Sequence, residues 1–234
     1  MNQLGAAPIL QADGFSHWIS MLPLLTQGQF GLFALLLFAI VISLTLHEYA
    51  HAASAWWLGD DTAQKAGRLT INPVAHIDPI GLLMVIAVGF GYARPVPVRP
   101  SRMRTSWGHA AVSAAGPLMN LLLAFLAVNL LVWGQSRGIS ALNGPAQQTL
   151  LMTLAQINVL LMAFNLIPLG PLDGSYVMAW ALPNGVSQRY QALNNQYGSM
   201  VFLGLIVLSV AGLPVFSWLL GVANRVLPWL VVVG

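Results

Sequence analysis

The chain has 234 residues, of which 57% are hydrophobic and 6% are charged. An ordinary soluble domain carries about 25% charged residues, so this composition indicates an integral membrane protein and excludes a typical soluble domain. Nine basic and six acidic residues give a net charge of +3, but the basic residues form no stripe, which argues against a nucleic-acid partner. Because the chain contains no cysteine, any transition-metal site must use His, Asp, Glu or water.

The first 28 residues are mixed in character and contain one charged residue, Asp13. The first Lys or Arg of the chain is Lys65, so the positively charged segment with which a secretory signal peptide begins is missing. We therefore expect residues 1–28 to stay attached as an N-terminal tail or interfacial segment.

Four apolar runs are long enough to be membrane-spanning helices, since each is close to or above the roughly 20 residues that the hydrocarbon core requires. They are Phe30 to Leu58, His109 to Trp133, Thr149 to Ile167 and Ser199 to Gly221. Shorter apolar segments lie at 80–92, at 175–182 and after Gly221. The sequence therefore predicts an all-α polytopic membrane protein with four to six transmembrane helices. We divide it into a transmembrane core at 29–185 and a C-terminal transmembrane segment and tail at 186–234.

The run from Ile80 to Tyr92 is too short and too rich in glycine to cross comfortably, and prolines follow at 95, 97 and 100. Basic residues flank it on both sides: Lys65, Arg68, Arg94, Arg99, Arg102 and Arg104. If the run dips into the membrane and returns, all six lie on one face, which the positive-inside rule makes cytoplasmic. We therefore predict a re-entrant or β segment near residues 80–100. Because proline cannot join the middle of a sheet, its extended part is either an edge strand or a surface loop.

The same rule orients the whole chain. It places Arg189 inside and Arg137 and Arg225 outside, which gives seven basic residues inside against two outside. The first span then enters from outside. Its last third, which contains two histidines, lies toward the cytoplasm.

The only glutamate of the chain lies between these two histidines, in His47-Glu48-Tyr49-Ala50-His51. Residues i and i+4 share one face of a helix, so His47 and His51 can offer two imidazole nitrogens to one ion, while Glu48 reaches a water bound to it. The alternative is a structural role without a metal, in which two buried histidines hydrogen-bond between helices. An ionisable group at the bilayer centre costs about 2.5–3.5 kcal/mol, so three together favour a metal. We predict one zinc ion per chain.

A catalytic zinc site usually takes three protein ligands. The remaining candidates are His17, His76, His109, Asp13, Asp60, Asp61, Asp78 and Asp173. Asp173 is the best placed, because it follows a break with two prolines and a glycine that ends a predicted span at the depth of the two histidines. The alternative role for Asp173 is an N-cap of the short segment 175–182.

Other polar residues are expected to serve structure rather than the site. Asp60 and Asp61 follow Gly59 at a helix end, where we expect them to face water. We interpret Lys65 and Arg68 as topological charges only. Structural or substrate-lining roles are favoured for His76 and Asp78, and a hydrogen bond between helices for Asn120.

The motif HEYAH followed by N-x-x-P-x-x-P-L-D-G, from Asn165 to Gly174, resembles the paired motifs of the site-2 protease family of intramembrane zinc metalloproteases. The blocks at 66–81, 92–98 and 113–120 are similar to segments of its compact prokaryotic members, which lack PDZ and CBS domains. This resemblance covers residues 30–185. It implies that His47, His51 and Asp173 bind zinc and that Glu48 is the general base.

The resemblance also implies a way of holding substrate. Asn165 would help to bind the substrate or the developing oxyanion. A membrane-inserted β segment near 92–98, with Tyr92, Pro95 and Val96, would pair with an unwound substrate helix. In this interpretation residues 29–185 form the catalytic core.

The implied function is hydrolysis of peptide bonds within or near transmembrane helices of membrane-anchored substrates, known as regulated intramembrane proteolysis. The expected partners are the lipid bilayer and a single-pass membrane protein or a signal peptide. The expected location is a prokaryotic plasma membrane, with the active site toward the cytoplasmic side. Two alternatives are an ion-handling membrane transporter, since intramembrane His, Asp and broken helices also mark ion pathways, and a catalytically inactive metal-binding scaffold.

Overall fold

The structure is a computed structural model that describes residues 21–89 and 91–233. Within this part of the chain every regular element is a helix, and four helices are long and apolar enough to cross a membrane. The protein is therefore an all-α polytopic membrane protein, as predicted. Asp13, His17 and most of the expected interfacial segment 1–28 lie outside the described residues.

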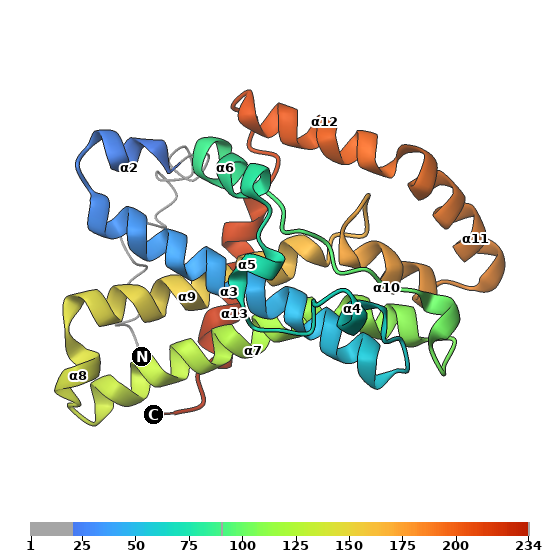
Figure 1. Cartoon of the computed structure of the whole chain (residues 1–234). Coiled ribbons are helices and arrows are strands. Elements are labelled where there is room, and N and C mark those ends of the chain that lie inside the picture. The colour runs from blue at the N-terminus through green and yellow to red at the C-terminus, as the bar shows by residue number, and fades with distance from the viewer. Residues whose placement is uncertain (1–20, 90, 234) are drawn as a thin grey trace.

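Three long helices form the centre of the structure: α3 (Phe30–Trp57), α7 (Gly108–Ser136) and α9 (Pro145–Asn165). Each packs against the other two, and Figure 1 shows them crossing one another at the middle of the molecule. Small residues such as Ala124, Ala127 and Ala155 line the contact of α7 with α9 and allow the two backbones to approach closely. These helices confirm the first three predicted spans.

The connection between α3 and α7 contains short elements: α4 (Thr62–Lys65), α5 (Pro73–His76), α6 (Pro79–Val88) and the 3-10 turn η3 (Pro100–Arg102). The apolar helix α6 has 10 residues, a length of about 15 Å, which is half of the hydrocarbon thickness. Asp78 caps it by accepting the N–H groups of Ile80 and Gly81 at 2.9 and 3.0 Å. Asp78 thus has the structural role that we favoured.

After α6 the chain runs extended toward η3, but the described residues contain no β-strand. The segment forms one isolated antiparallel bridge, between Ile77 and Ala93. The edge-strand expectation is therefore wrong in its strict form. The physical reason is that Ile77 lies between α5 and α6, so no extended chain continues beside the segment on this edge, while Pro95 and Pro97 have no N–H to offer on the other edge.

Buried side chains hold this extended segment in place of a ladder. The carboxylate of Asp60, which is fully buried, accepts the N–H groups of Thr62 and Arg99. The guanidinium of Arg68, also buried, donates to the carbonyl of Arg94. Solvent exposure of Asp60 and a purely topological role of Arg68 were thus wrong, because the backbone of this segment needs polar partners that no neighbouring strand supplies.

The C-terminal part differs from the predicted span Ser199–Gly221. After α10 (Asp173–Ala181), the helix α11 (Asn184–Leu193), the π-helical turn η4 (Asn194–Gly198) and α12 (Ser199–Val210) run on as one apolar helix of 27 residues, Asn184–Val210. Figure 1 shows it as a long arc on the outside of the bundle. It begins earlier than predicted and ends before Pro214, whose missing N–H and fixed φ do not favour continuation of the helix.

Three further helices complete the fold. The short helices α2 (Leu22–Thr26) and α8 (Ser140–Asn143) precede α3 and α9. The last helix, α13 (Trp218–Leu230), corresponds to the apolar tail of the sequence. It packs against α7 and α9 through Ala223 and Leu227. The tail is therefore part of the core packing around the central helices.

Candidate metal centre

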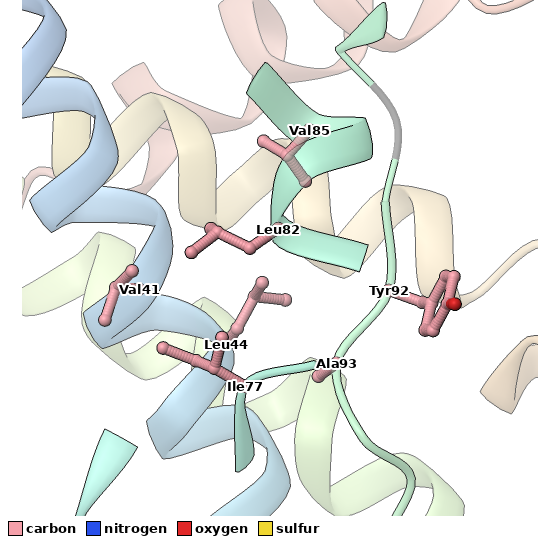
Figure 2. A pocket seen from close by; sticks show the side chains of 7 residues that line it. All are labelled: Val41, Leu44, Ile77, Leu82, Val85, Tyr92 and Ala93. Atoms are coloured by element: carbon pink, nitrogen blue, oxygen red, sulfur yellow. The ribbon is translucent and has the colours of Figure 1, made fainter. Parts of the chain in front are cut away.

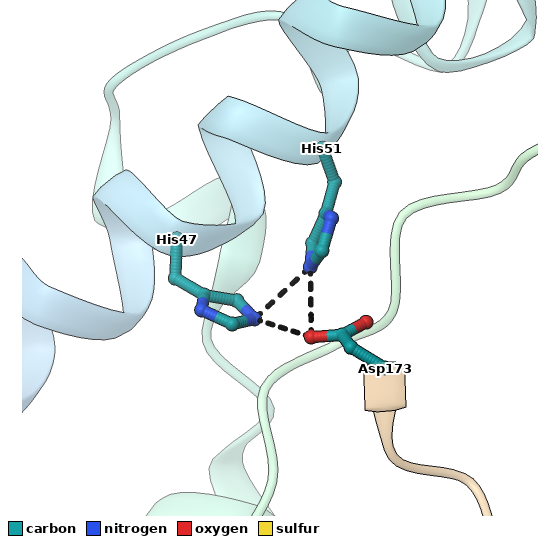
Figure 3. Close-up of side chains that lie close together, drawn as sticks. All are labelled: His47, His51 and Asp173. Atoms are coloured by element: carbon teal, nitrogen blue, oxygen red, sulfur yellow. Dashed lines mark hydrogen bonds and ion pairs between the residues drawn. The ribbon is translucent and has the colours of Figure 1, made fainter. Parts of the chain in front are cut away.

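Two residues of α3 and one of α10 converge on a single point (Figure 3). The Nε2 atoms of His47 and His51 lie 3.0 Å apart. Oδ2 of Asp173 lies 3.2 Å from Nε2 of His47 and 3.4 Å from Nε2 of His51. Both histidines are buried and Asp173 is half-buried. In the described part of the chain, this is the group of His, Asp and Glu side chains that could hold a metal ion.

The donor set and its spacing fit zinc. Zinc–nitrogen and zinc–oxygen bonds are about 2.0–2.2 Å long, so the donor atoms of a tetrahedral site lie about 3.3 Å apart. The three observed separations run from 3.0 to 3.4 Å. Two imidazole nitrogens and one carboxylate oxygen also leave a fourth position for water or substrate, which is typical of catalytic zinc.

The second nitrogen of each ring indicates which nitrogen faces the ion. Nδ1 of His51 lies 2.7 Å from the carbonyl oxygen of Val112, and Nδ1 of His47 lies 2.6 Å from Oδ1 of Asn120. Both oxygens accept, so each Nδ1 carries the proton and each Nε2 keeps a lone pair. Two lone pairs 3.0 Å apart repel each other unless a cation lies between them. The arrangement thus suits a bound cation.

One face of α7 provides the surroundings of both histidines. Val112, Gly116 and Asn120 follow one another at intervals of four residues, and so lie in one row along the helix. A Cβ atom on Gly116 would lie 2.4 Å from Nε2 of His51 and 2.6 Å from Nε2 of His47. The missing side chain of Gly116 is therefore what leaves room for the ligand atoms and an ion.

Asp173 is the first residue of α10, which packs against α7. The N-cap of this helix is Leu172, so the N-cap alternative for Asp173 is wrong. The preceding loop is fastened to the fourth apolar helix: the N–H of Gly170 donates to Oδ1 of Asn194 at 2.9 Å, and Nδ2 of Asn194 donates back to the carbonyl of Gly170 at 3.2 Å. Tyr190 donates its hydroxyl to the carbonyl of Pro168 at 3.0 Å. These contacts fix the loop that presents Asp173.

Among residues 21–89 and 91–233, the other candidates for the third ligand are engaged elsewhere. Nε2 of His76 lies 2.7 Å from the carbonyl oxygen of Thr70, and the ring of His109 packs on that of Tyr176 with 4.3 Å between centroids. Asp78 caps α6 and Asp60 holds the extended segment, as described above. Asp61 forms surface ion pairs with Lys65 and Arg102.

Glu48 follows His47 on α3 and is 9% exposed. Its Oε2 accepts the backbone N–H of Val96 at 3.2 Å, so the extended segment passes directly over this carboxylate.

Pro95 and Tyr92 of the same segment are exposed. Tyr92 also lines a small apolar hollow between α3, α6 and the extended segment, together with Leu44 and Leu82 (Figure 2).

Asn165 ends α9, and its Nδ2 donates to the carbonyl of Leu161 at 3.0 Å. Its amide nitrogen is thus engaged within its own helix in this conformation.

Sequence reasoning missed two buried residues behind the site, Ser43 and Asn158. The available signal was the polar amide of Asn158 in the middle of an apolar span, where polar groups are costly.

Comparison with known proteins gives three informative relatives. The chain is 41% identical over 175 residues to "Putative zinc metalloprotease YwhC" of Bacillus subtilis, covering 74% of this chain and 80% of that protein. It is 30% identical over 207 residues to "Putative zinc metalloprotease Rip2" of Mycolicibacterium smegmatis, covering 85% and 76%. The protein of the same name from Mycobacterium tuberculosis is 26% identical over 214 residues, covering 88% and 79%. Neither a protein-family model nor a solved structure matches the chain.

The fold and the site together define a multi-pass membrane protein with a buried site for a metal ion. With the relatives above, the chain belongs to the site-2 protease family. Its cofactor is zinc, as the sequence predicted.

Proposed function

We propose that this chain is an intramembrane zinc endopeptidase that hydrolyses peptide bonds within or near transmembrane helices of membrane-anchored substrates. The observation that carries this proposal is the placement of Glu48 next to a buried triangle of His47, His51 and Asp173, on a helix long and apolar enough to span a membrane. An ion-handling transporter would need no carboxylate beside two ligands of a tetrahedral site, so this arrangement favours hydrolysis.

The chain's own residues supply the proton transfers. Bound zinc supplies Lewis acidity, which polarises a peptide carbonyl and makes a nearby water more acidic. The Val96 N–H engages Oε2 of Glu48, and Oε1 is then the atom that takes a proton from this water. The water oxygen bonds to the carbonyl carbon, the C–N bond breaks, and Glu48 returns the proton to the leaving nitrogen.

The extended segment supports a role in presenting the substrate. The N–H groups of Arg94 and Val96 donate to the carbonyl of His76 and to Glu48. Neighbouring residues of an extended chain turn their backbone groups to opposite edges, so Pro95 and Pro97 offer carbonyls but no N–H on the other edge. We propose that an unwound substrate pairs there through its own N–H groups, a one-sided form of strand addition.

Further substrate contacts are assigned to Tyr92, Pro95 and Asn165. Tyr92 and Pro95 are exposed beside Glu48's partner Val96. Asn165 lies at the end of α9, where the loop toward Asp173 begins. In our proposal its amide, once released from Leu161, helps to hold the substrate or the developing oxyanion.

We also propose a prokaryotic plasma membrane as the location, with the active site toward the cytoplasm. Six of the nine basic residues lie between α3 and α7, and His51 lies within two turns of the end of α3 that leads into this connection. The positive-inside rule supports a cytoplasmic face for that end. The proposed substrates are single-pass membrane proteins or signal peptides, both of which present one apolar helix.

The test uses wild type and Glu48→Gln in proteoliposomes with two tagged reporters, a single-pass membrane protein and a signal peptide. Wild type should release a fragment whose new terminus, located by mass spectrometry, lies within or beside the apolar helix. Glu48→Gln should bind zinc and produce no fragment, because the amide cannot take the proton. Cleavage retained in this variant would refute the assigned base. Zinc-loaded wild type that cleaves neither reporter would favour the inactive scaffold.

A further inference from the structure

A chain of buried polar side chains leads away from His47 into the helix core. Nδ1 of His47 lies 2.6 Å from Oδ1 of Asn120, and Nδ2 of Asn120 donates to Oδ1 of Asn158 at 2.8 Å. Nδ2 of Asn158 donates to the hydroxyl of Ser43 at 2.8 Å, and Ser43 donates to the carbonyl of Ala39 at 2.7 Å. Asn120, Asn158 and Ser43 are each 0% exposed. The chain thus runs from α3 through α7 and α9 and returns to α3.

The direction of every hydrogen bond in this chain is set at its far end. The carbonyls of Ala39 and Leu154 can only accept, so Ser43 donates to the first and the amide NH2 of Asn158 faces the second, at 2.8 Å. The oxygen of Asn158 then faces Asn120. Asn120 must therefore turn its NH2 toward Asn158 and its oxygen toward His47.

An oxygen at this place accepts the Nδ1 proton of His47, which leaves the lone pair on Nε2, the atom that faces His51 and Asp173. A flipped Asn120 amide would instead present a donor to Nδ1 and move the proton to Nε2. That tautomer cannot bind a metal through Nε2. Asn158 on α9, oriented by Ser43 and the Leu154 carbonyl, thus determines whether His47 is ready to serve as a ligand.

We propose that Asn158 is a positioning residue of the zinc centre, which acts through Asn120 to fix the tautomer and the ring orientation of His47. This inference rests on the proposed role of His47 as a zinc ligand. A purely structural role would be a hydrogen-bonded clamp between α7 and α9. Alanines already pack these two helices closely, and polar side chains inside a membrane bundle are costly enough to call for a further reason.

The test measures the zinc dissociation constant by chelator competition in detergent, and thermal unfolding in parallel, for two variants of Asn158. Asn158→Leu removes the oxygen that orients Asn120 and should weaken zinc binding by about 10- to 100-fold. Asn158→Asp keeps an oxygen facing Asn120 and should weaken it much less. Thermal stability should follow the opposite order, since a buried carboxyl group costs more than leucine inside a membrane helix bundle.

Asn129→Leu is the matched control on α7. Asn129 is also buried, but its amide holds Leu230 and Val232 at the C-terminal end of the chain. Its replacement should lower the unfolding temperature and leave the zinc dissociation constant unchanged. In an Asn120→Leu background, Asn158→Leu should weaken zinc binding no further, because it acts through Asn120.

Two results would overturn the inference. The first is a zinc dissociation constant that equals the wild-type value in Asn158→Leu, or that follows thermal stability across all variants. Either outcome would mean that the hydrogen-bonded side chains serve only as a clamp between helices. The second is wild type that binds zinc no better than Asp173→Ala. That result would overturn the proposed ligand set as well, so the two failures are distinguishable.

Discussion

Gly116 of α7 faces His51 of α3 so closely that a methyl group in place of its hydrogen would lie 2.4 Å from Nε2 of His51. The same methyl group would lie 2.6 Å from Nε2 of His47. The histidine rings cannot move away easily, because Val112 and Asn120 hold their other nitrogens. The close approach of α7 to α3 at this glycine is thus a condition for the metal site.

We predict that Gly116→Ala binds zinc at least 100-fold more weakly than wild type, since the loss should equal or exceed that from the removal of a partner behind a ligand. Zinc per chain after purification in detergent is the measurement. Gly204→Ala is the control, because Gly204 also lies in a helix but has open space where a Cβ would stand. Full zinc content in Gly116→Ala would show that the rings do not meet the metal where this structure places them.

The ligands and their supports differ in how far the sequence could reveal them. The i, i+4 spacing of His47 and His51 fixes one helix face, and Asp173 follows a break that only a cavity or buried site tolerates. Each feature is local, so the sequence could single out Asp173 as the best placed of eight candidates for the third ligand, and the family resemblance implied the full set. Asn158 lies 115 residues from its partner Ser43, and only the packing of α9 against α3 brings them together. No local pattern encodes such a contact.

The fold shows the same division. Long apolar runs determined α3, α7 and α9 to within a few residues, because membrane helices must satisfy their own backbone. The segment at 91–99 was harder, since its partners are the side chains of Asp60 and Arg68 rather than a strand. The fourth span begins earlier than predicted because α11 is more polar at its start than the other spans. The helix is apolar and long enough to span a membrane only when α11 is taken together with η4 and α12.

Removal of Asp173, the proposed third ligand, should abolish tight zinc binding in a chain that still folds. We predict about one zinc per chain in wild type and in Glu48→Gln, and a large loss in Asp173→Ala, because two imidazoles alone hold zinc weakly. Asp61→Ala is the control, since Asp61 is a surface residue in ion pairs that contribute little. Metal analysis of the purified proteins decides it. Undiminished zinc in Asp173→Ala would mean that another residue completes the site.

Asp60 should make the stability of the chain depend on acid pH. Burial raises the pKa of the Asp60 carboxyl, but hydrogen bonds from Thr62 and the Arg99 N–H outweigh this and hold the pKa below its ordinary value of 3.8. A carboxyl group with a lowered pKa stabilises the fold above its unfolded pKa, and this contribution is lost as the pH falls through the folded pKa. The charge of Asp60 therefore contributes at neutral pH and not in strong acid.

Accordingly, Asp60→Asn should lower the free energy of unfolding by about 1.5–3 kcal/mol at pH 7, the range for hydrogen bonds to a charged group. The difference from wild type should narrow as the pH falls below about 4, the ordinary pKa that the carboxyl group has in the unfolded chain, and toward the lower pKa that it has in the fold. Unfolding in detergent, followed by circular dichroism between pH 7 and pH 3, measures both values. A difference that is constant over this range would show that the charge of Asp60 has no part in holding the extended segment.

The hydrogen bond from Val96 to Glu48 should matter for turnover more than for folding. Val96→Pro removes this N–H in a segment that is already extended and rich in proline, so the backbone can accept the substitution. Without the donor, one oxygen of the Glu48 carboxylate is no longer held in place. We expect kcat toward a tagged single-pass reporter to fall about 10-fold, a part of the roughly 100- to 10,000-fold that a general base contributes, because Glu48 itself is kept. Zinc content should stay at the wild-type level.

Val96→Ala, which keeps the N–H and shortens the side chain, should lose less activity. Equal losses in the two variants would assign the effect to the side chain of Val96 and its contact with substrate, and not to the orientation of Glu48.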